Sequence, residues 1–216
     1  MTVVSSIDLS ANWGPPPSQG NRPTCLAFTA SELNRNLSGT DSALSTEYIY
    51  RAAARRSATW KAGGGLQMTH LSEALAQHGQ PTDLVCPYLA HEPVEAPPDL
   101  PQLAASEKLY AATMQLISTA PQEIENELRR GKPVGLVLKL TDTFLKPTQG
   151  TIAFSHMLLS IDMHHAVVAT GLGKHSKTDE PHFRIRNTWG ETWGEQGNAW
   201  LPHSYVRAHA VTAFKV

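Results

Sequence analysis

The chain contains 216 residues, of which 41% are hydrophobic and 17% charged, and its formal net charge at pH 7 is −1. These values indicate an ordinary globular protein, long enough to bury a sizeable core in one large domain or in two packed halves. A net charge so close to zero gives no long-range field that would attract nucleic acid or an anionic membrane, so we expect neither as a partner. No apolar run of about 18 residues is present, so we expect no transmembrane helix.

The N-terminal sequence lacks the basic region and apolar stretch of a signal peptide. We therefore expect a protein that is cytoplasmic or exported without a recognisable signal. Its two cysteines, Cys25 and Cys86, are too few for a scaffold built on disulfides, and they favour a reducing compartment with a thiol available for chemistry. We expect Cys86, which precedes Pro87 and Tyr88, to be a packing residue.

The first half of the sequence predicts helices. Residues 1–24 are rich in Pro, Gly, Ser and Asn, which indicates extended chain and turns. From Cys25, apolar residues recur at helical spacing until Ser38 and Gly39 stop the run, so Cys25 falls in the first turn of a helix. Further helices are predicted over residues 45–56, with Ser45 as N-cap, and over residues 69–77. The proline-rich residues 87–101 predict an ordered but irregular crossing segment.

The second half predicts one short helix, over residues 121–131, followed by strands. The predicted strands cover residues 134–140, 152–154, 166–170 and 183–186. Helices first and strands later, without regular alternation, indicate an α+β fold.

Cys25 is the first candidate catalytic residue. A thiol attacks carbonyl groups only as the thiolate, and an unperturbed thiol has a pKa of about 8.5. The partial positive charge at a helix N-terminus favours the thiolate form. A lone cysteine in a helix is more often a buried structural residue, so position alone leaves that alternative open.

Among ten histidines, His165 is the best candidate for a base. It stands at the start of an apolar strand, where an imidazole can face a cleft, whereas His164 points to the opposite face because strand side chains alternate. His156 is a weaker candidate in a less regular stretch.

Asn187 and Trp189 form the third candidate group, in a segment where two tryptophans, four residues apart, are each followed by glycine. An Asn side chain that accepts the imidazole N–H fixes the tautomer, and an indole over that bond keeps water away. The alternative is a tryptophan-rich packing corner with an Asn in a turn.

Together these segments resemble the papain family of cysteine peptidases. Gln19 opens Gln-Gly-Asn-Arg-Pro-Thr-Cys-Leu-Ala-Phe, which resembles the family's Gln-Gly-x-x-x-x-Cys-x-Ala-Phe. His165 opens a segment similar to the family's His-Ala-Val strand. Asn187 opens Asn-Thr-Trp-Gly-Glu-Thr-Trp-Gly-Glu-Gln-Gly, which is similar to Asn-Ser-Trp-Gly-x-x-Trp-Gly-x-x-Gly. The order of Cys, His and Asn also agrees, with His165 140 positions after Cys25.

The resemblance implies one papain-like peptidase domain over residues 1–216, with a helical half at about 10–110, a β-rich half at 111–216 and an N-terminal segment able to cross between them. The active site would lie in the cleft between the halves. It implies Cys25 as nucleophile, His165 as base, Asn187 as its orienting partner and Gln19 as oxyanion donor, with Trp189 in support. The implied partner is a protein or peptide substrate, with no cofactor.

Alignment to the family implies a set of substrate-binding residues: Gly64, Gly65, Leu66, Val137, Met163 and Ala166. The last four are apolar and would line the pocket for the second residue before the cleaved bond, although the same residues suit an ordinary core.

The sequence also departs from the family pattern. Arg22 and Ala62 stand where the family has cysteines, which fits a reducing environment or a bacterial-type subset without these disulfides. Pro23 and Leu26 replace a glycine and a tryptophan beside the nucleophile, so substrate preference is expected to differ. Members of the family are usually made with a pro-segment that blocks the cleft, and none precedes the domain in this sequence. We therefore expect either that it has been removed or that activity is controlled by an inhibitor or a regulatory partner, by restricted substrate choice or by export.

Two other functions share these residues. One is a binding protein that keeps the fold without catalysis, and the other is an acyltransferase or a deconjugating isopeptidase that uses the same triad. A metal site is the weakest alternative, because the sequence has neither Cys-x-x-Cys nor His-Glu-x-x-His spacing.

Overall fold

The structure is a computed structural model, and it describes residues 2–91, 97 and 99–216. The chain divides into two compact units, one of Gln19–Gln115 with Val216 and one of Met1–Ser18 with Leu116–Lys215. Residues 10–18, which the sequence assigned to the helical half, belong to the β-rich unit. Two hydrogen bonds from the Arg186 guanidinium, to the carbonyls of Gly14 and Pro15, hold this segment there.

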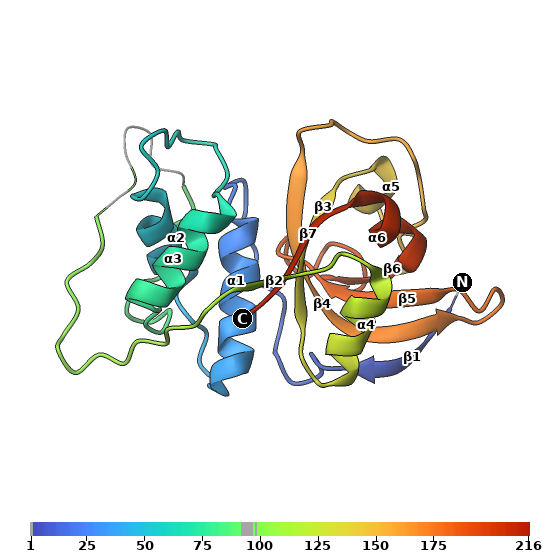
Figure 1. Cartoon of the computed structure of the whole chain (residues 1–216), viewed down its shortest axis with the longest axis horizontal. Coiled ribbons are helices and arrows are strands. Elements are labelled where there is room, and N and C mark those ends of the chain that lie inside the picture. Colours follow the sequence, from blue (N-terminus) through green and yellow to red (C-terminus); the bar gives the residue numbers. More distant parts are fainter. Residues whose placement is uncertain (1, 92–96, 98) are drawn as a thin grey trace. The chain divides into compact units, whose positions relative to one another are not determined.

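Three helices form the helical unit (Figure 1). They are α1 (Cys25–Ser38), α2 (Thr46–Ala54) and α3 (Met68–His78), and they confirm the three helices predicted for this half. The caps follow from local chemistry, since the Ser45 hydroxyl accepts the Tyr48 N–H at 3.0 Å and Gly39 ends α1 with a φ of 62°. The described residues of the segment 87–101 form neither helix nor strand, and residues 92–96 and 98 lie outside the described part.

Strands and short helices make up most of the β-rich unit (Figure 1). Its strands are β1 (Val3–Asp8), β3 (Val134–Lys139), β4 (His164–His175), β5 (Pro181–Arg186), β6 (Asn198–Pro202) and β7 (Ala210–Lys215), with β2 (Gln115–Ile117) beginning at the unit boundary. Its helices are α4 (Pro121–Arg129), α5 (Asp142–Leu145) and α6 (His203–His209). The sheet runs in the order β2-β7-β3-β4-β5-β6, and β1 pairs antiparallel with β4. The fold is therefore α+β, as predicted.

Two details of the predicted strands are wrong. Residues 152–154 form no strand, because Ile152 makes a single backbone bond to Trp200 while Phe154 lies exposed. Strand β4 does not end at the glycines after Thr170. A Cβ atom on Gly171 would lie 2.3 Å from the Ile7 carbonyl oxygen, so glycine is what lets β1 pair with β4 at this point.

The core of the β-rich unit lies against one face of the sheet. Leu136 and Leu138 of β3 and Val167 and Ala169 of β4 point into it, together with residues of α4, β5, β6 and α6. His165 is paired in register with Leu138 and shares this face, because side chains alternate along a strand. The His165 imidazole therefore lies on the core-facing side of the sheet, at the start of β4.

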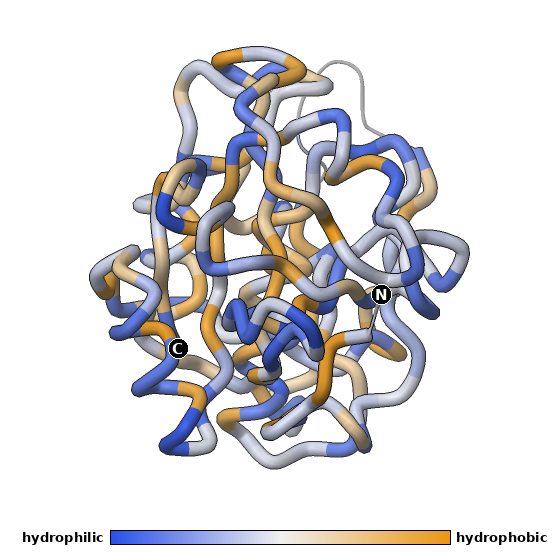
Figure 2. The backbone as a smooth tube through the Cα atoms, turned by 90° about the vertical axis from the view of Figure 1, so that its right-hand side faces the viewer, coloured by the Kyte–Doolittle hydropathy of each residue, from blue (hydrophilic) through white to orange (hydrophobic). Residues whose placement is uncertain are grey.

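Apolar and polar residues are interspersed along the chain, as the hydropathy colouring of Figure 2 shows. Among the helices that the structure describes, none has both the length and the apolar character needed to cross a bilayer.

Burial of His203 predicts a pH-dependent stability. Its ring stacks on Phe183 with centroids 4.1 Å apart, its Nε2 has no hydrogen-bond partner among the described residues, and burial lowers its pKa to about 4. Between pH 4 and 6.5 the unfolded chain binds this proton more readily than the folded one, so the free energy of unfolding rises with pH in this window. In His203→Phe, the rise from pH 4.5 to 6.5 should be smaller by about 2 kcal/mol, measured by denaturant unfolding. An unchanged rise would contradict the assignment.

Candidate active site

Cys25 is the first residue of α1 and is half-buried. At the N-cap position, Thr24 makes no capping bond with its side chain; its hydroxyl lies 2.7 Å from the Tyr88 hydroxyl instead. The first turn, Cys-Leu-Ala-Phe, contains no acidic residue that would neutralise the helix dipole. Cys25 therefore stands at the positive end of α1, a position at which a helix stabilises negative charge.

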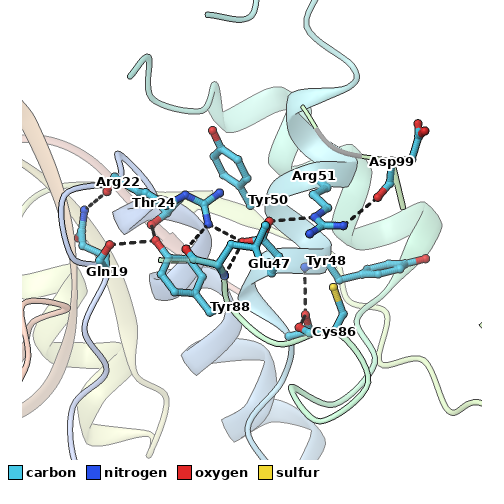
Figure 3. Close-up of polar contacts among 12 residues, drawn as sticks. Gln19, Arg22, Thr24, Glu47, Tyr48, Tyr50, Arg51, Cys86, Tyr88 and Asp99 are labelled. Carbon is cyan, nitrogen blue, oxygen red and sulfur yellow. Dashed lines mark hydrogen bonds and ion pairs between the residues drawn. The ribbon is translucent and has the colours of Figure 1, made fainter. Parts of the chain in front are cut away.

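Gln19 lies in the loop before Cys25, within the same unit, and only 7% of its surface is exposed. Its side-chain Nε2 donates a hydrogen bond to the Arg22 carbonyl at 2.6 Å, and its own carbonyl accepts the Tyr88 hydroxyl at 2.9 Å (Figure 3). Main chain and side chain of Gln19 are thus fixed by different partners, which pre-organises the carboxamide.

His165 begins the buried part of β4, and its Nε2 lies 2.6 Å from the Asn187 Oδ1. The same Oδ1 accepts the Thr188 backbone N–H at 2.8 Å, so this atom must be the amide oxygen. An oxygen accepts, and therefore Nε2 of His165 carries the proton. In the neutral imidazole the basic lone pair is then on Nδ1.

An aromatic group encloses this imidazole. The Trp189 ring lies 4.4 Å from the His165 ring at 34°, and Phe144 of α5 meets it edge-on at 6.0 Å. The indole N–H of Trp193 in turn donates to the Phe144 carbonyl at 3.1 Å. Burial in this group lowers the pKa of His165 to about 4, although the hydrogen bond with Asn187 opposes part of the shift.

The glycines of the Asn187 segment are needed for its shape. After β5 ends, the Asn187 N–H donates to the Gly197 carbonyl at 3.0 Å, and the Gly190 N–H donates to the Pro17 carbonyl at 3.0 Å. Gly197 has a φ of 76°, and a Cβ on it would lie 2.7 Å from Pro16. Only glycine meets both conditions, which explains its place in the motif.

The predicted site residues therefore form two half-sites, one in each unit. The structure brings His165, Asn187 and Trp189 together in the β-rich unit, and it places Gln19 and Cys25 on one loop and helix start in the helical unit. The other histidines considered, His156 and His164, are both exposed. The role of Phe144 was missed, because nothing in the local sequence of α5 indicates that its ring reaches His165.

The predicted substrate-binding residues are divided in the same way. In the β-rich unit, Val137 of β3 is paired directly with Ala166 of β4, and Met163 is 47% exposed just before this strand. In the helical unit, Leu66 is half-buried and follows the exposed Gly65. Gly64 is half-buried and donates its N–H to the Lys61 carbonyl at 3.0 Å.

No group of three or more metal-ligating side chains occurs within the part of the chain that the structure describes.

Residues 14–210 match the family model of the papain family cysteine proteases, and the chain belongs to that family. Over 79 residues it is 30% identical to the oryzain gamma chain of Oryza sativa subsp. japonica, a match that covers 36% of this chain and 21% of that protein. It is 29% identical to the thiol protease aleurain of Arabidopsis thaliana over 79 residues, which cover 36% of this chain and 22% of aleurain. These matches thus span about a fifth of the length of the curated relatives.

Solved structures show the same fold. Xylellain, a cysteine protease from Xylella fastidiosa, is similar with a TM-score of 0.75 and 20% identity, covering 100% of this chain and 87% of that one. Digestive procathepsin L 3 of Tenebrio molitor gives a TM-score of 0.78 at 17% identity, over 100% of this chain and 70% of the other. The cysteine protease CMS1MS2 of Carica candamarcensis, solved with E-64, gives 0.74 at 19% identity, over 98% and 97%. These likenesses confirm the predicted papain-like fold.

The geometry predicts the tautomer of His165. In a Cys25→Ala variant at pH 7, which removes any thiolate, the imidazole should be neutral with its proton on Nε2, because Asn187 Oδ1 can only accept. The nitrogen chemical shifts of the ring in an NMR spectrum measure this directly. In the double variant that adds Asn187→Ala, the preference for Nε2–H should weaken. A proton on Nδ1 in the presence of Asn187 would contradict the assignment.

Proposed function

We propose that this protein hydrolyses peptide bonds, with Cys25 as nucleophile, His165 as base, Asn187 as the partner that orients the base and Gln19 as an oxyanion donor. The observation that carries the proposal is the hydrogen bond between His165 Nε2 and Asn187 Oδ1, because it leaves Nδ1 as the proton acceptor. The proposal requires Cys25 Sγ and His165 Nδ1 to come within hydrogen-bonding reach. Membership of the papain family supports it.

Activation of the thiol is the first chemical step. The proton of Cys25 passes to Nδ1 of His165, which gives a thiolate and an imidazolium. Within the β-rich unit the pKa of His165 is about 4, so its imidazole is neutral near pH 7. In the proposed mechanism, the Cys25 thiolate therefore supplies the negative charge that stabilises the imidazolium. The two groups would then titrate as a pair, and neither pKa belongs to one residue.

Bond cleavage follows from the same groups. The thiolate sulfur adds to the peptide carbonyl carbon, and the negative charge that develops on the oxygen is met by the Gln19 Nε2–H and the Cys25 backbone N–H. When the C–N bond breaks, the imidazolium gives its proton to the leaving amine. Water, deprotonated by the neutral His165, then hydrolyses the thioester and restores the thiol.

Substitutions of the four proposed catalytic residues should give graded losses. Cys25→Ala should abolish turnover of a peptide substrate and His165→Ala should nearly abolish it, whereas Asn187→Ala should cost less because it only orients the base. Gln19→Ala should lower kcat by about 10²–10³ through the loss of one oxyanion donor. Steady-state kinetics with Cys86→Ala as the control for the second cysteine measures this series. Turnover that survives Cys25→Ala would contradict the proposal, and product analysis with added amines would reveal acyl transfer.

The pocket for the second residue before the cleaved bond is proposed to be apolar. Val137 and Ala166, paired across β3 and β4, with Met163 and Leu66, offer no charge to a side chain bound there. When a peptide library is cleaved, the preferred substrates should therefore carry an aliphatic or aromatic residue at the second position before the cleaved bond. Preference for charged residues would contradict this pocket.

A further inference from the structure

Arg22 lies three residues before the proposed nucleophile and is only 2% exposed. Its Nη1 lies 2.5 Å from the Glu47 carboxylate and donates to the Leu89 carbonyl at 2.7 Å. Its guanidinium carbon lies 4.8 Å from the ring centroids of both Tyr50 and Tyr88. A buried arginine is costly unless charge, hydrogen bonds and aromatic faces all compensate it, and here all three are present.

Glu47 of α2 is the buried counter-charge, with no exposed surface. Beyond Arg22 it accepts the Leu89 backbone N–H at 3.3 Å, and its other oxygen binds Arg51 at 2.8 Å (Figure 3). The carboxylate therefore ties three separate segments of the helical unit together: the loop before α1, the helix α2 and the chain at residues 88–89. Both cysteines are free thiols, so no disulfide among the described residues performs this task.

Tyr88 completes the arrangement. Its ring covers Arg22, and its hydroxyl donates to the Gln19 carbonyl at 2.9 Å and lies 2.7 Å from the Thr24 hydroxyl. The loop from Gln19 to Thr24 is thus held near both ends by Tyr88 and in the middle by Arg22. We call Arg22, Glu47 and Tyr88 the clamp.

The clamp acts on an atom that the proposed chemistry uses. Gln19 Nε2 donates to the carbonyl of Arg22 itself, so the position of the Arg22 main chain fixes the direction of the Gln19 carboxamide. The Arg22 side chain, anchored on Glu47 and Leu89, fixes that main chain in turn. This gives a continuous chain of contacts from a buried carboxylate to the donor for the oxyanion.

We propose that Arg22, held by Glu47 and Tyr88, is a positioning residue that orients Gln19 for oxyanion binding. The inference rests on the proposed peptidase function. We expect lysine to be a poor replacement for arginine here. Its ammonium keeps the charge but lacks the planar guanidinium group, whose carbon lies 4.8 Å from both the Tyr50 and the Tyr88 ring while Nη1 contacts Glu47 and Leu89.

The first test separates positioning from general stability. In Arg22→Lys, kcat for a peptide amide should fall about 10–30-fold with KM within about 3-fold, because a misdirected donor weakens transition-state binding alone. Alkylation of Cys25 by iodoacetamide, in which the thiolate displaces iodide from a saturated carbon, forms no oxyanion. Its rate should therefore stay within about 3-fold of the wild type. Equal losses in both reactions would overturn the inference.

A double-mutant cycle with Gln19→Ala gives the second test. If Arg22 acts through Gln19, Arg22→Lys should cost less than about 3-fold in kcat when Gln19 is already alanine. If the fold-losses in kcat of Arg22→Lys and Gln19→Ala multiply in the double variant, the inference is overturned. Should Arg22→Lys fail to fold, Tyr88→Phe replaces it in the cycle, because phenylalanine keeps the ring over Arg22 and removes only the hydroxyl contacts with Gln19 and Thr24.

Arg51→Lys is the matched control. Arg51 binds the same carboxylate, but its other hydrogen bond goes to the Asp99 carbonyl and not to the loop before α1. This variant should lower the melting temperature while kcat stays within about 2-fold of the wild type. A kcat loss equal to that of Arg22→Lys would overturn the positioning role.

The results also separate failure of this inference from failure of the proposed function. A wild type that shows no turnover would overturn the peptidase proposal and this inference together. Normal wild-type turnover, with kcat losses of Arg22→Lys and Gln19→Ala that multiply in the double variant, would overturn only the inference.

Discussion

The hydrogen bond between His165 and Asn187 is the interaction on which the account depends. It is buried, 2.6 Å long and oriented by the Thr188 N–H, so the protein chooses the imidazole tautomer before any substrate arrives. Burial alone would leave His165 a weak base, since it lowers the pKa to about 4. The hydrogen bond with Asn187 opposes part of this shift. In the proposed mechanism, the negative charge of the Cys25 thiolate would provide the remaining stabilisation of the protonated imidazole.

Each half-site rests on the regular structure of its own unit. In the β-rich unit, the pairing of β3 with β4 sets the position of His165, and the glycines after β5 let Asn187 and Trp189 fold back over it. In the helical unit, the start of α1 determines the position of Cys25, and the buried pair of Arg22 and Glu47 holds the loop before it. In the proposed mechanism, the catalytic residues are therefore divided between two half-sites, one positioned by the pairing of β3 with β4 and the other by the buried ion pair of Arg22 with Glu47.

The sequence predicted the helices of the first half closely because their caps, Ser45 and Gly39, are local signals. It predicted Cys25, His165 and Asn187 as candidates from motif resemblance, and the structure confirms the contact of the last two. Strands β1 and β7 escaped prediction because their partners, β4 and β3, are distant in the chain. Strand β6 escaped as well, although its partner β5 is close in the chain. The buried state of Arg22 escaped too, because burial of a charge depends on groups that come from elsewhere, here Glu47 and the segment at residues 88–89.

The most direct test of the account is the pH dependence of Cys25 alkylation in the wild type and in His165→Ala. An isolated thiol with a pKa of about 8.5 is almost entirely protonated at pH 6 and reacts slowly there. If the imidazole and the helix start act on this sulfur, the wild-type rate at pH 6 should remain near its maximum, while the rate of His165→Ala should rise only in the alkaline range. Two identical profiles with a midpoint near that of a free thiol would contradict the account.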